Sequence, residues 1–249
     1  MDECNDVGKI NALQKLIDDS NNIVFFGGAG VSTESGIPDF RSQDGLYAQK
    51  WKYPPEVIVS RSFFDSNTKE FYRFYREKLI ISGIKPNTAH LKLAELEAKG
   101  KLKAIVTQNI DGLHQAAGSK TVYELHGSTL RNYCMNCHKP YSVDFISKSA
   151  ESPDTLPHCT DCDGLIKPDV VLYEEGLDDN TVQGAIDAIA AADLLIIGGT
   201  SLVVYPAAGL IRYFHGRNIV LINKSETVND AHADLVIHGS IGKVLEQIK

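Results

Sequence analysis

The sequence has few features of several kinds, and each shortage excludes a class of protein. No apolar run approaches the roughly 18 residues that a membrane-spanning helix requires. Acidic residues outnumber basic ones, 32 against 25, and the net charge of −7 argues against a nucleic-acid partner. The stretch MDECNDVGKINALQKL lacks the charged-then-apolar pattern of an export signal. We therefore expect a cytoplasmic protein with no membrane partner.

Helical and strand patterns alternate along the chain, and 43% of its 249 residues are hydrophobic, as in ordinary globular proteins. This alternation predicts an α/β fold with a doubly wound, mostly parallel, Rossmann-like sheet. Strands are predicted near 23–26, 102–107, 122–125, 170–172, 194–197, 219–222 and 235–237. Helices are predicted near 10–17, 71–79, 88–99, 179–191, 206–214 and 240–248, and a long loop over 32–60.

Four of the five cysteines form two C-x2-C pairs with 21 residues between them: Cys134, Cys137, Cys159 and Cys162. This spacing matches a zinc ribbon, although the gap is one residue longer than usual. Four thiolates would close a tetrahedral site, so the sequence predicts one structural Zn²⁺. His138 or His158 could replace a cysteine as ligand, and a redox disulfide pair is the remaining alternative. Cys4 stands alone, with no role predicted.

The predicted organisation is one domain over residues 1–249 with three parts. The large Rossmann-like part comprises about 1–32, 84–130 and 169–249, the zinc-ribbon insert about 131–168, and a loop and helical segment about 33–83.

Polar or glycine-containing turns follow three predicted strands: Gly28-Ala29-Gly30, Gly199-Thr200-Ser201 and Asn223. The carboxyl ends of parallel strands form a crevice, and main-chain N–H groups there can face a pyrophosphate, so these turns predict a dinucleotide site. The first turn alone could be only a tight strand-to-helix connection. Thr33 stands where the usual fingerprint has its third glycine, and no strand ending in an acidic residue is evident about 20 residues further on.

Two further polar groups end predicted strands. Residues 107–111, Thr-Gln-Asn-Ile-Asp, could bind a carboxamide or sugar hydroxyls. They could instead form an Asx-turn, or an N-cap for the next helix with Asp111 as the cap. His126 could act as a general base near neutral pH, or could be a satisfied structural histidine. His90 and His114 lie in predicted helical contexts and are poorer candidates.

These motifs, in this order, resemble the sirtuins, the NAD-dependent protein lysine deacylases, and the short chain looks like a bacterial member. The resemblance covers nearly the whole chain. It rests on GAGVSTESGIPDFR at 28–41, TQNID at 107–111, HG at 126–127, the four cysteines, KPDVV at 167–171, GTSL at 199–202 and IN at 222–223.

The resemblance implies that NAD is a consumed co-substrate lying across the strand ends. His126 would be the general base, with Asn109 also catalytic, and Phe40 would shield the nicotinamide side from water. The residues implied in NAD binding are Gly28, Ala29, Gly30, Thr33, Phe40, Arg41, Gln108, Asn109, Ile110, Asp111, Gly199, Thr200, Ser201, Asn223, Ser240 and Ile241.

The implied reaction transfers the acyl group of an acylated lysine in a protein to the ADP-ribose of NAD. Nicotinamide, a product and inhibitor, and 2′-O-acyl-ADP-ribose would be released. The peptide would add as a strand at Val170, Val171, Leu172, Tyr173, Leu202 and Val203. The alternatives are mono-ADP-ribosyl transfer and a non-catalytic zinc-ribbon binding module.

Two departures from the family pattern bear on the substrate. Glu174 stands where the family often has glycine, and the extra carboxylate predicts a preference for basic peptides. Tyr75 stands where family members that remove succinyl or malonyl groups carry arginine, with Arg73 and Arg76 out of register. Without that guanidinium the pocket should not compensate a buried acyl carboxylate, so acetyl and other uncharged acyl groups are expected.

Overall fold

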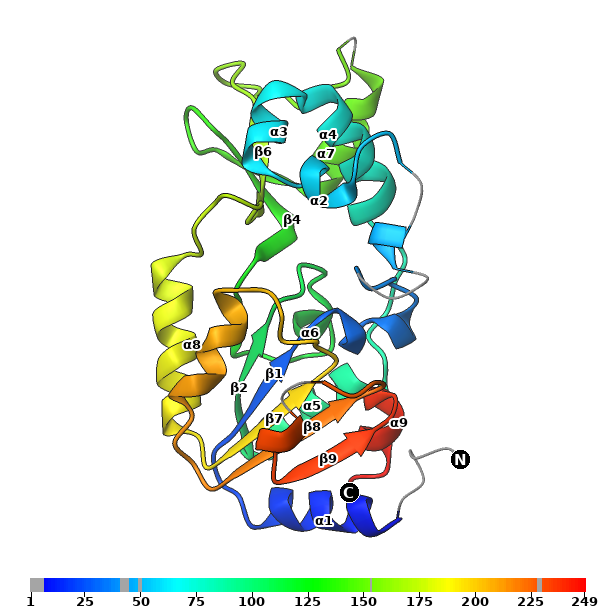
Figure 1. The fold of residues 1–249 in the computed structure, drawn as a ribbon. Coiled ribbons are helices and arrows are strands. Elements are labelled where there is room, and N and C mark those ends of the chain that lie inside the picture. The colour runs from blue at the N-terminus through cyan, green and yellow to red at the C-terminus, as the bar shows by residue number, and fades with distance from the viewer. Residues whose placement is uncertain (1–6, 41–44, 49–50, 153, 228–229) are drawn as a thin grey trace.

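The computed structural model describes residues 7–40, 45–48, 51–152, 154–227 and 230–249. Six parallel strands form the main sheet, in the order β3–β2–β1–β7–β8–β9 (Figure 1). Their bounds are β1 Ile23–Gly27, β2 Leu102–Thr107, β3 Val122–Glu124, β7 Leu194–Gly198, β8 Asn218–Asn223 and β9 Leu235–His238. The chain reverses its direction of progress between β1 and β7, so the doubly wound fold predicted from the sequence is confirmed.

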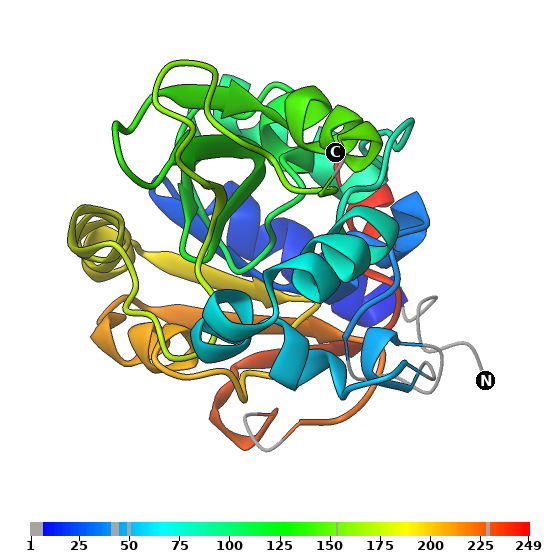
Figure 2. The same ribbon diagram turned by 90° about the horizontal axis from the view of Figure 1, so that it is seen from above.

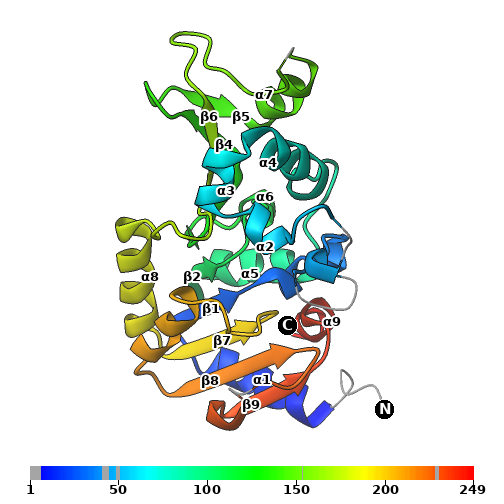
Figure 3. The same ribbon diagram turned by 45° about the horizontal axis from the view of Figure 1, so that its top comes forward.

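The central strands β1 and β7 lie side by side (Figure 3), and every residue of both is buried. Alternate side chains of β1 enter different hydrophobic clusters: Ile23 and Phe25 pack on one face, Val24 and Phe26 on the other. Because both faces are covered, these strands are continuous apolar runs rather than alternating ones.

Helices cover both faces of the sheet (Figure 2). On one face lie α1 (Val7–Asp18), α5 (Thr88–Ala98) and α9 (Ile241–Glu246); on the other lie α8 (Asp179–Ala191) and the 3-10 helix η7 (Ala207–Tyr213). This sheet with its five helices is called the large lobe. Element η7 corresponds to the helix predicted over 206–214, which is thus a 3-10 helix and not an α-helix. Among the described residues, no helix has the length and apolar character needed to cross a bilayer.

A second, three-stranded antiparallel sheet lies above the first, in the order β5–β4–β6 (Figure 1). With the helices packed on it, it forms the small lobe, which has its own hydrophobic cluster. The bounds are β4 Gly127–Cys134, β5 Pro140–Ser142, β6 Ile166–Val170, α2 Pro55–Ile58, α3 Arg61–Ser66, α4 Thr68–Phe74, the π-helix η5 Tyr75–Leu79, α7 Val143–Lys148 and the 3-10 helix η6 Ser149–Glu151.

The strand predicted at 170–172 is wrong as a continuation of the main sheet. β6 ends at Val170 and pairs antiparallel with β4, with Val170 opposite Gly127. Its residues Lys167, Pro168 and Asp169 break the apolar pattern, which hid the strand in the sequence.

The remaining elements are short. They are the 3-10 helices η2 Ala29–Val31, η3 Thr33–Ser35, η4 Leu46–Ala48 and η8 Asp230–His232, and helix α6 Leu113–Ala116. Within the predicted loop 32–60, the described residues form only η3, η4 and α2, so no long helix or strand interrupts it.

Candidate functional site

A cavity of about 900 Å³ lies at the carboxyl edge of the main sheet and extends to small-lobe residues. Nineteen residues predicted for the site line it: Gly28, Ala29, Gly30, Thr33, Phe40, Gln108, Asn109, Ile110, Asp111, His126, Val170, Val171, Leu172, Tyr173, Gly199, Thr200, Ser201, Asn223 and Ile241. The structure therefore brings most of the predicted residues together.

Four predicted residues do not line the cavity in the described structure. Ser240 is the residue before α9, next to the lining residue Ile241. Leu202 is buried in the core of the large lobe, and Val203 is 52% exposed. Arg41 lies outside the described residues.

The turns after β1 and β7 are packed against each other. A Cβ atom on Gly30 would lie 2.7 Å from the Cα of Gly199, and one on Gly199 would lie 2.4 Å from the main-chain nitrogen of Val31. Gly199 also has φ +61°, a left-handed conformation that glycine adopts readily. Both positions therefore require glycine.

The prediction that N–H groups of the first turn face a pyrophosphate is wrong for its two glycines. The Gly28 N–H donates to the Gly198 carbonyl (3.3 Å), and the Gly30 N–H donates to the Gly199 carbonyl (2.8 Å). The close packing of the two turns uses these donors within the protein.

Three strand ends are connected by a side-chain network at the floor of the cavity. Gln108 Nε2, after β2, donates to Thr200 Oγ1 (3.0 Å). The Thr200 N–H donates to Asn223 Oδ1, and Asn223 Nδ2 donates to the Thr200 carbonyl, both at 3.0 Å. The network fixes two amide side chains before any ligand binds.

A second network joins the loop after β1 to the turn after β2. Ser32 Oγ donates to Asp111 Oδ2 (2.7 Å), and Asn109 Nδ2 donates to Ser32 Oγ (3.1 Å). Asp111 Oδ1 also accepts the Leu113 N–H (2.9 Å). Asp111 therefore makes the Asx-turn predicted as an alternative as well as the contact with Ser32. Ser32 was not among the predicted site residues. In the sequence, Ser32 was marked only by its position within the motif at residues 28–41.

His126 follows β3, and its ring orientation is set by one main-chain contact. Nδ1 lies 3.0 Å from the Gln108 carbonyl oxygen, which can only accept, so Nδ1 carries the hydrogen and Nε2 keeps its lone pair. Burial lowers the pKa of His126 below its usual 6.5, despite the hydrogen bond to Gln108. The ring is therefore a neutral base at pH 7, with a geometry suited to proton abstraction.

Two other histidines form a buried pair behind the site. His90 in α5 and His114 in α6 are at most 1% exposed, and their ring centroids are 4.7 Å apart. His90 Nδ1 accepts the Asn87 N–H (3.3 Å), whereas both ring nitrogens of His114 lack a partner among the described residues. Burial lowers the pKa of His90 to about 4 and that of His114 to about 3, so both rings are neutral at pH 7.

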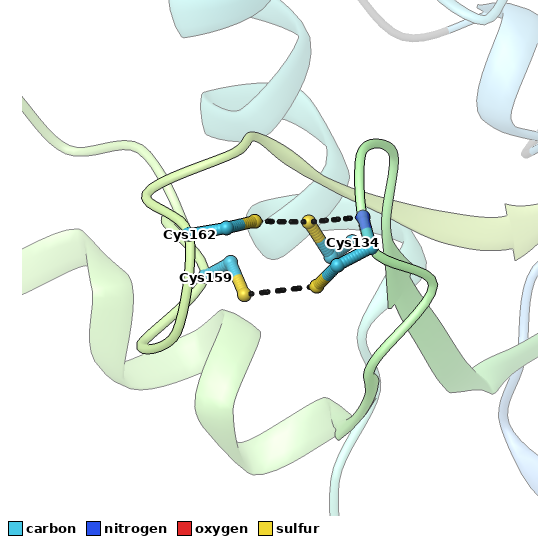
Figure 4. A group of neighbouring side chains, drawn as sticks. Cys134, Cys159 and Cys162 are labelled. Atoms are coloured by element: carbon cyan, nitrogen blue, oxygen red, sulfur yellow. Dashed lines mark hydrogen bonds between the residues drawn. The ribbon is translucent and has the colours of Figure 1, made fainter.

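The four cysteines converge at one end of the small sheet (Figure 4), with all four Sγ atoms within 4.8 Å of one another. Cys134 Sγ lies 3.4 Å from Cys162 Sγ, and Cys137 Sγ lies 3.5 Å from Cys159 Sγ. Ligands at the Zn–S distance of about 2.3 Å are about 3.8 Å apart in a tetrahedron, so the cluster fits one zinc ion.

Hydrogen-bond donors lower the pKa of two of the four thiols, Cys134 and Cys159. The N–H groups of Asn136 and Cys137 donate to Cys134 Sγ. A hydrogen bond from the Tyr141 hydroxyl lowers the pKa of Cys159 to about 6. His158 uses both ring nitrogens elsewhere, on the Asp154 carboxylate (2.8 Å) and the Asp163 carbonyl (3.1 Å). The cluster of the described residues is thus made of cysteines alone.

The residues after β6 form one wall of the cavity. We call residues 171–175 the docking segment. The Val171 N–H donates to the His126 carbonyl (3.0 Å), and the Leu172 carbonyl accepts the Glu175 N–H (3.0 Å). Within the described part of the chain, no hydrogen bond uses the Val171 carbonyl oxygen. The Val171 carbonyl oxygen is therefore an unused acceptor in this wall.

Fold and site together define a doubly wound protein with a nucleotide-sized cavity and a four-cysteine module. A Sir2 family model matches residues 28–206, and the chain belongs to this family. It is 65% identical over 243 residues to an NAD-dependent protein deacetylase of Clostridium perfringens and 62% identical over 242 residues to one of Clostridium acetobutylicum. Each match covers 96% of this chain and 98% of the relative.

Solved structures of the family match the whole arrangement. The structure titled "Sir2-p53 peptide-NAD+" has a TM-score of 0.85 at 41% identity, and "Sir2 bound to acetylated peptide" has 0.86 at 40%. Each comparison covers 96% of both chains. The resemblance stated from the sequence motifs is confirmed.

Proposed function

We propose that this protein is an NAD-dependent protein lysine deacetylase. It transfers the acyl group of an acylated lysine to the ADP-ribose of NAD and releases nicotinamide and 2′-O-acyl-ADP-ribose. The observation that carries the proposal is the neutral His126 ring in the same cavity as the two polar networks, with its Nδ1–H held by Gln108. The names of the relatives support the same activity.

Each network has a separate part in this reaction. The Gln108–Thr200–Asn223 network would hold the riboses and phosphates of NAD, and the Ser32–Asn109–Asp111 network would orient the nicotinamide carboxamide. The amide oxygen of the acyl-lysine would attack ribose C1′ as the bond to nicotinamide breaks. His126 would then remove a proton from the 2′-hydroxyl, that oxygen would attack the acyl-bearing carbon, and a later addition of water would release the free lysine amine. Phe40, which lines the cavity, would keep water from the reactive sugar.

Contacts on the helix pair α4–η5 support a preference for acetyl and other uncharged acyl groups. Tyr75 is fully buried, and both neighbouring arginines are engaged away from the cavity. Arg73 pairs with Glu70, and Arg76 donates to the carbonyls of Ile146 and Thr155. Neither of these two arginines is therefore placed to neutralise a succinyl carboxylate.

The four thiolates would hold one structural Zn²⁺, which closes the tip of the small lobe and takes no part in the chemistry. We also propose a cytoplasmic location, because cysteine pairs that act as metal ligands are typical of reducing compartments.

Product analysis tests the proposal. The protein is incubated with NAD and matched acetyl- and succinyl-lysine peptides, and the products are identified by mass spectrometry. We expect 2′-O-acyl-ADP-ribose and free lysine peptide, with kcat/KM about 10²-fold or more higher for acetyl, since a buried uncompensated carboxylate is costly. ADP-ribose attached to protein, without acyl-ADP-ribose, would instead identify mono-ADP-ribosyl transfer.

A further inference from the structure

The docking segment is bonded to the small-lobe helices rather than to a strand. The Tyr173 N–H donates to the Val59 carbonyl, and the Arg61 N–H donates to the Tyr173 carbonyl, both at 3.0 Å. Tyr173 thus pairs with the corner between α2 and α3. The wall that a peptide would contact is therefore held by α3.

Glu174 adds a side-chain bond to the same helix. Its Oε2 accepts the Ser62 N–H (2.8 Å) and its Oε1 accepts the Ser62 hydroxyl (2.9 Å). Glu174 has φ +77°, in the left-handed region where glycine is the usual residue. The left-handed conformation is unfavourable for a glutamate. The two charge-assisted hydrogen bonds to Ser62 compensate for this conformational cost. The carboxylate of Glu174 is also engaged within the protein, which weakens the expectation that it selects basic peptides.

These bonds complete the first turn of α3. Helices leave their first N–H groups without internal partners. Here the Arg61 N–H is taken by Tyr173, the Ser62 N–H by Glu174, and the Phe63 N–H by the Ser60 hydroxyl (3.2 Å). Two of the three partners come from the docking segment, so the end of α3 and the segment form one bonded unit.

Glu175 holds the other side of the segment. Its Oε1 lies 3.2 Å from the Arg61 guanidinium. Its Oε2 accepts from Lys167 Nζ (3.0 Å) and from the Leu172 N–H (2.9 Å), and Lys167 is only 4% exposed. Lys167 also donates to the Val170 carbonyl (2.9 Å). The residues on both sides of Val171 are therefore held by hydrogen bonds. The Val171 carbonyl itself is left for a ligand.

We propose that Glu174 is a positioning residue that sets the affinity for the acylated peptide by fixing the docking segment on α3. This inference rests on the proposed deacetylase function. Glu174 does not touch the reacting atoms, so its loss should raise the KM for peptide while kcat and the KM for NAD stay nearly unchanged.

The decisive variant is Glu174→Gly. Glycine adopts φ +77° freely, so we expect this variant to retain the fold. We expect the KM for an acetyl-lysine peptide, and its Kd by fluorescence anisotropy, to rise about 5- to 10-fold, with kcat within about twofold. Glu174→Gln keeps an oxygen that can accept from Ser62, so its KM should lie between those of the wild type and Glu174→Gly.

Asp178 offers a matched control. It caps α8 with the same pair of bonds, accepting the Thr181 N–H and hydroxyl, both at 2.8 Å. Asp178→Ala should lower Tm by about 2–4 °C and leave the peptide KM unchanged. A peptide KM unchanged in Glu174→Gly, or raised equally in Asp178→Ala, would overturn the inference. Failure of the proposed function is distinguishable, since it appears as absence of acyl-ADP-ribose with the wild-type protein.

Discussion

The chemistry of the site depends on which nitrogen of His126 carries the hydrogen. The Gln108 carbonyl fixes that hydrogen on Nδ1 and leaves Nε2 as the basic atom. The same carbonyl belongs to the residue whose side chain contacts Thr200. The base and the floor of the cavity are therefore positioned by one residue.

Removal of this imidazole should remove general-base assistance, which contributes about 10²–10⁴-fold to rate. We expect His126→Ala to lower kcat for deacetylation by at least about 10²-fold while zinc content and Tm stay close to those of the wild type. In the wild type, burial lowers the pKa of His126 below 6.5, so kcat/KM should fall only at a pH below 6.5. Wild-type activity in the variant would contradict the assignment.

The buried pair His90 and His114 should make stability depend on pH. Their pKa values are lowered to about 4 and about 3, whereas the unfolded chain titrates near 6.5. Between these values the unfolded state binds more protons. Stability should therefore fall as the pH drops below 6.5, by about 1.4 kcal/mol per pH unit for each ring.

Urea unfolding at pH 7.5 and 5.5 measures this effect. His114→Leu should lose less free energy of unfolding between the two pH values than the wild type. The control His215→Leu changes an exposed ring and should retain the wild-type dependence. Equal dependence in all three proteins would show that the pair does not titrate as inferred.

At this scale most of the residues predicted for the site do line the cavity, because they follow strands and occur in recognisable blocks. The sequence did not predict Ser32 as a site residue, because a serine beside a glycine turn carries no chemical signal of its own. The use of the Gly28 and Gly30 N–H groups was also not predictable. It depends on contact with a turn about 170 residues away in the chain.

Among the elements, the strands of the main sheet were easier to predict than those of the small sheet. β1 and β7 are buried on both faces and are uninterrupted apolar runs. β6 contains a lysine, a proline and an aspartate, and only its pairing with β4 identifies it. The cysteine spacing nevertheless predicted the metal module, because ligand geometry imposes a sequence pattern even where hydrophobic periodicity fails.

The cysteine module should depend on its metal. Cys137→Ser removes one of four thiolates, and we expect loss of bound zinc measured by atomic absorption, with Tm lower by roughly 5–10 °C. His158→Gln is the control, because both nitrogens of His158 bond outside the cluster, and its zinc content should stay at one per chain. Zinc retained by Cys137→Ser, or lost by His158→Gln, would mean a different ligand set.

For the whole molecule, the cavity is lined by residues of both lobes, so a ligand that fills it contacts both. Binding to the folded chain alone stabilises it by about 2.7 kcal/mol at a concentration 100 times Kd. NAD or acetyl-lysine peptide at that excess should each raise Tm by about 5 °C or more in a thermal melt. The unacetylated peptide is the control and should give a smaller shift. No shift with either ligand would contradict binding in this cavity.

The amide of Asn223 at the cavity floor has only one way to face. Asn223 both accepts from and donates to the main chain of Thr200, so turning its side chain over would set like groups against each other in both contacts. Its pattern of donors and acceptors is therefore established when the chain folds, and an arriving molecule loses no affinity in ordering it. Discrimination between molecules of similar shape then depends on whether their polar atoms match a fixed template.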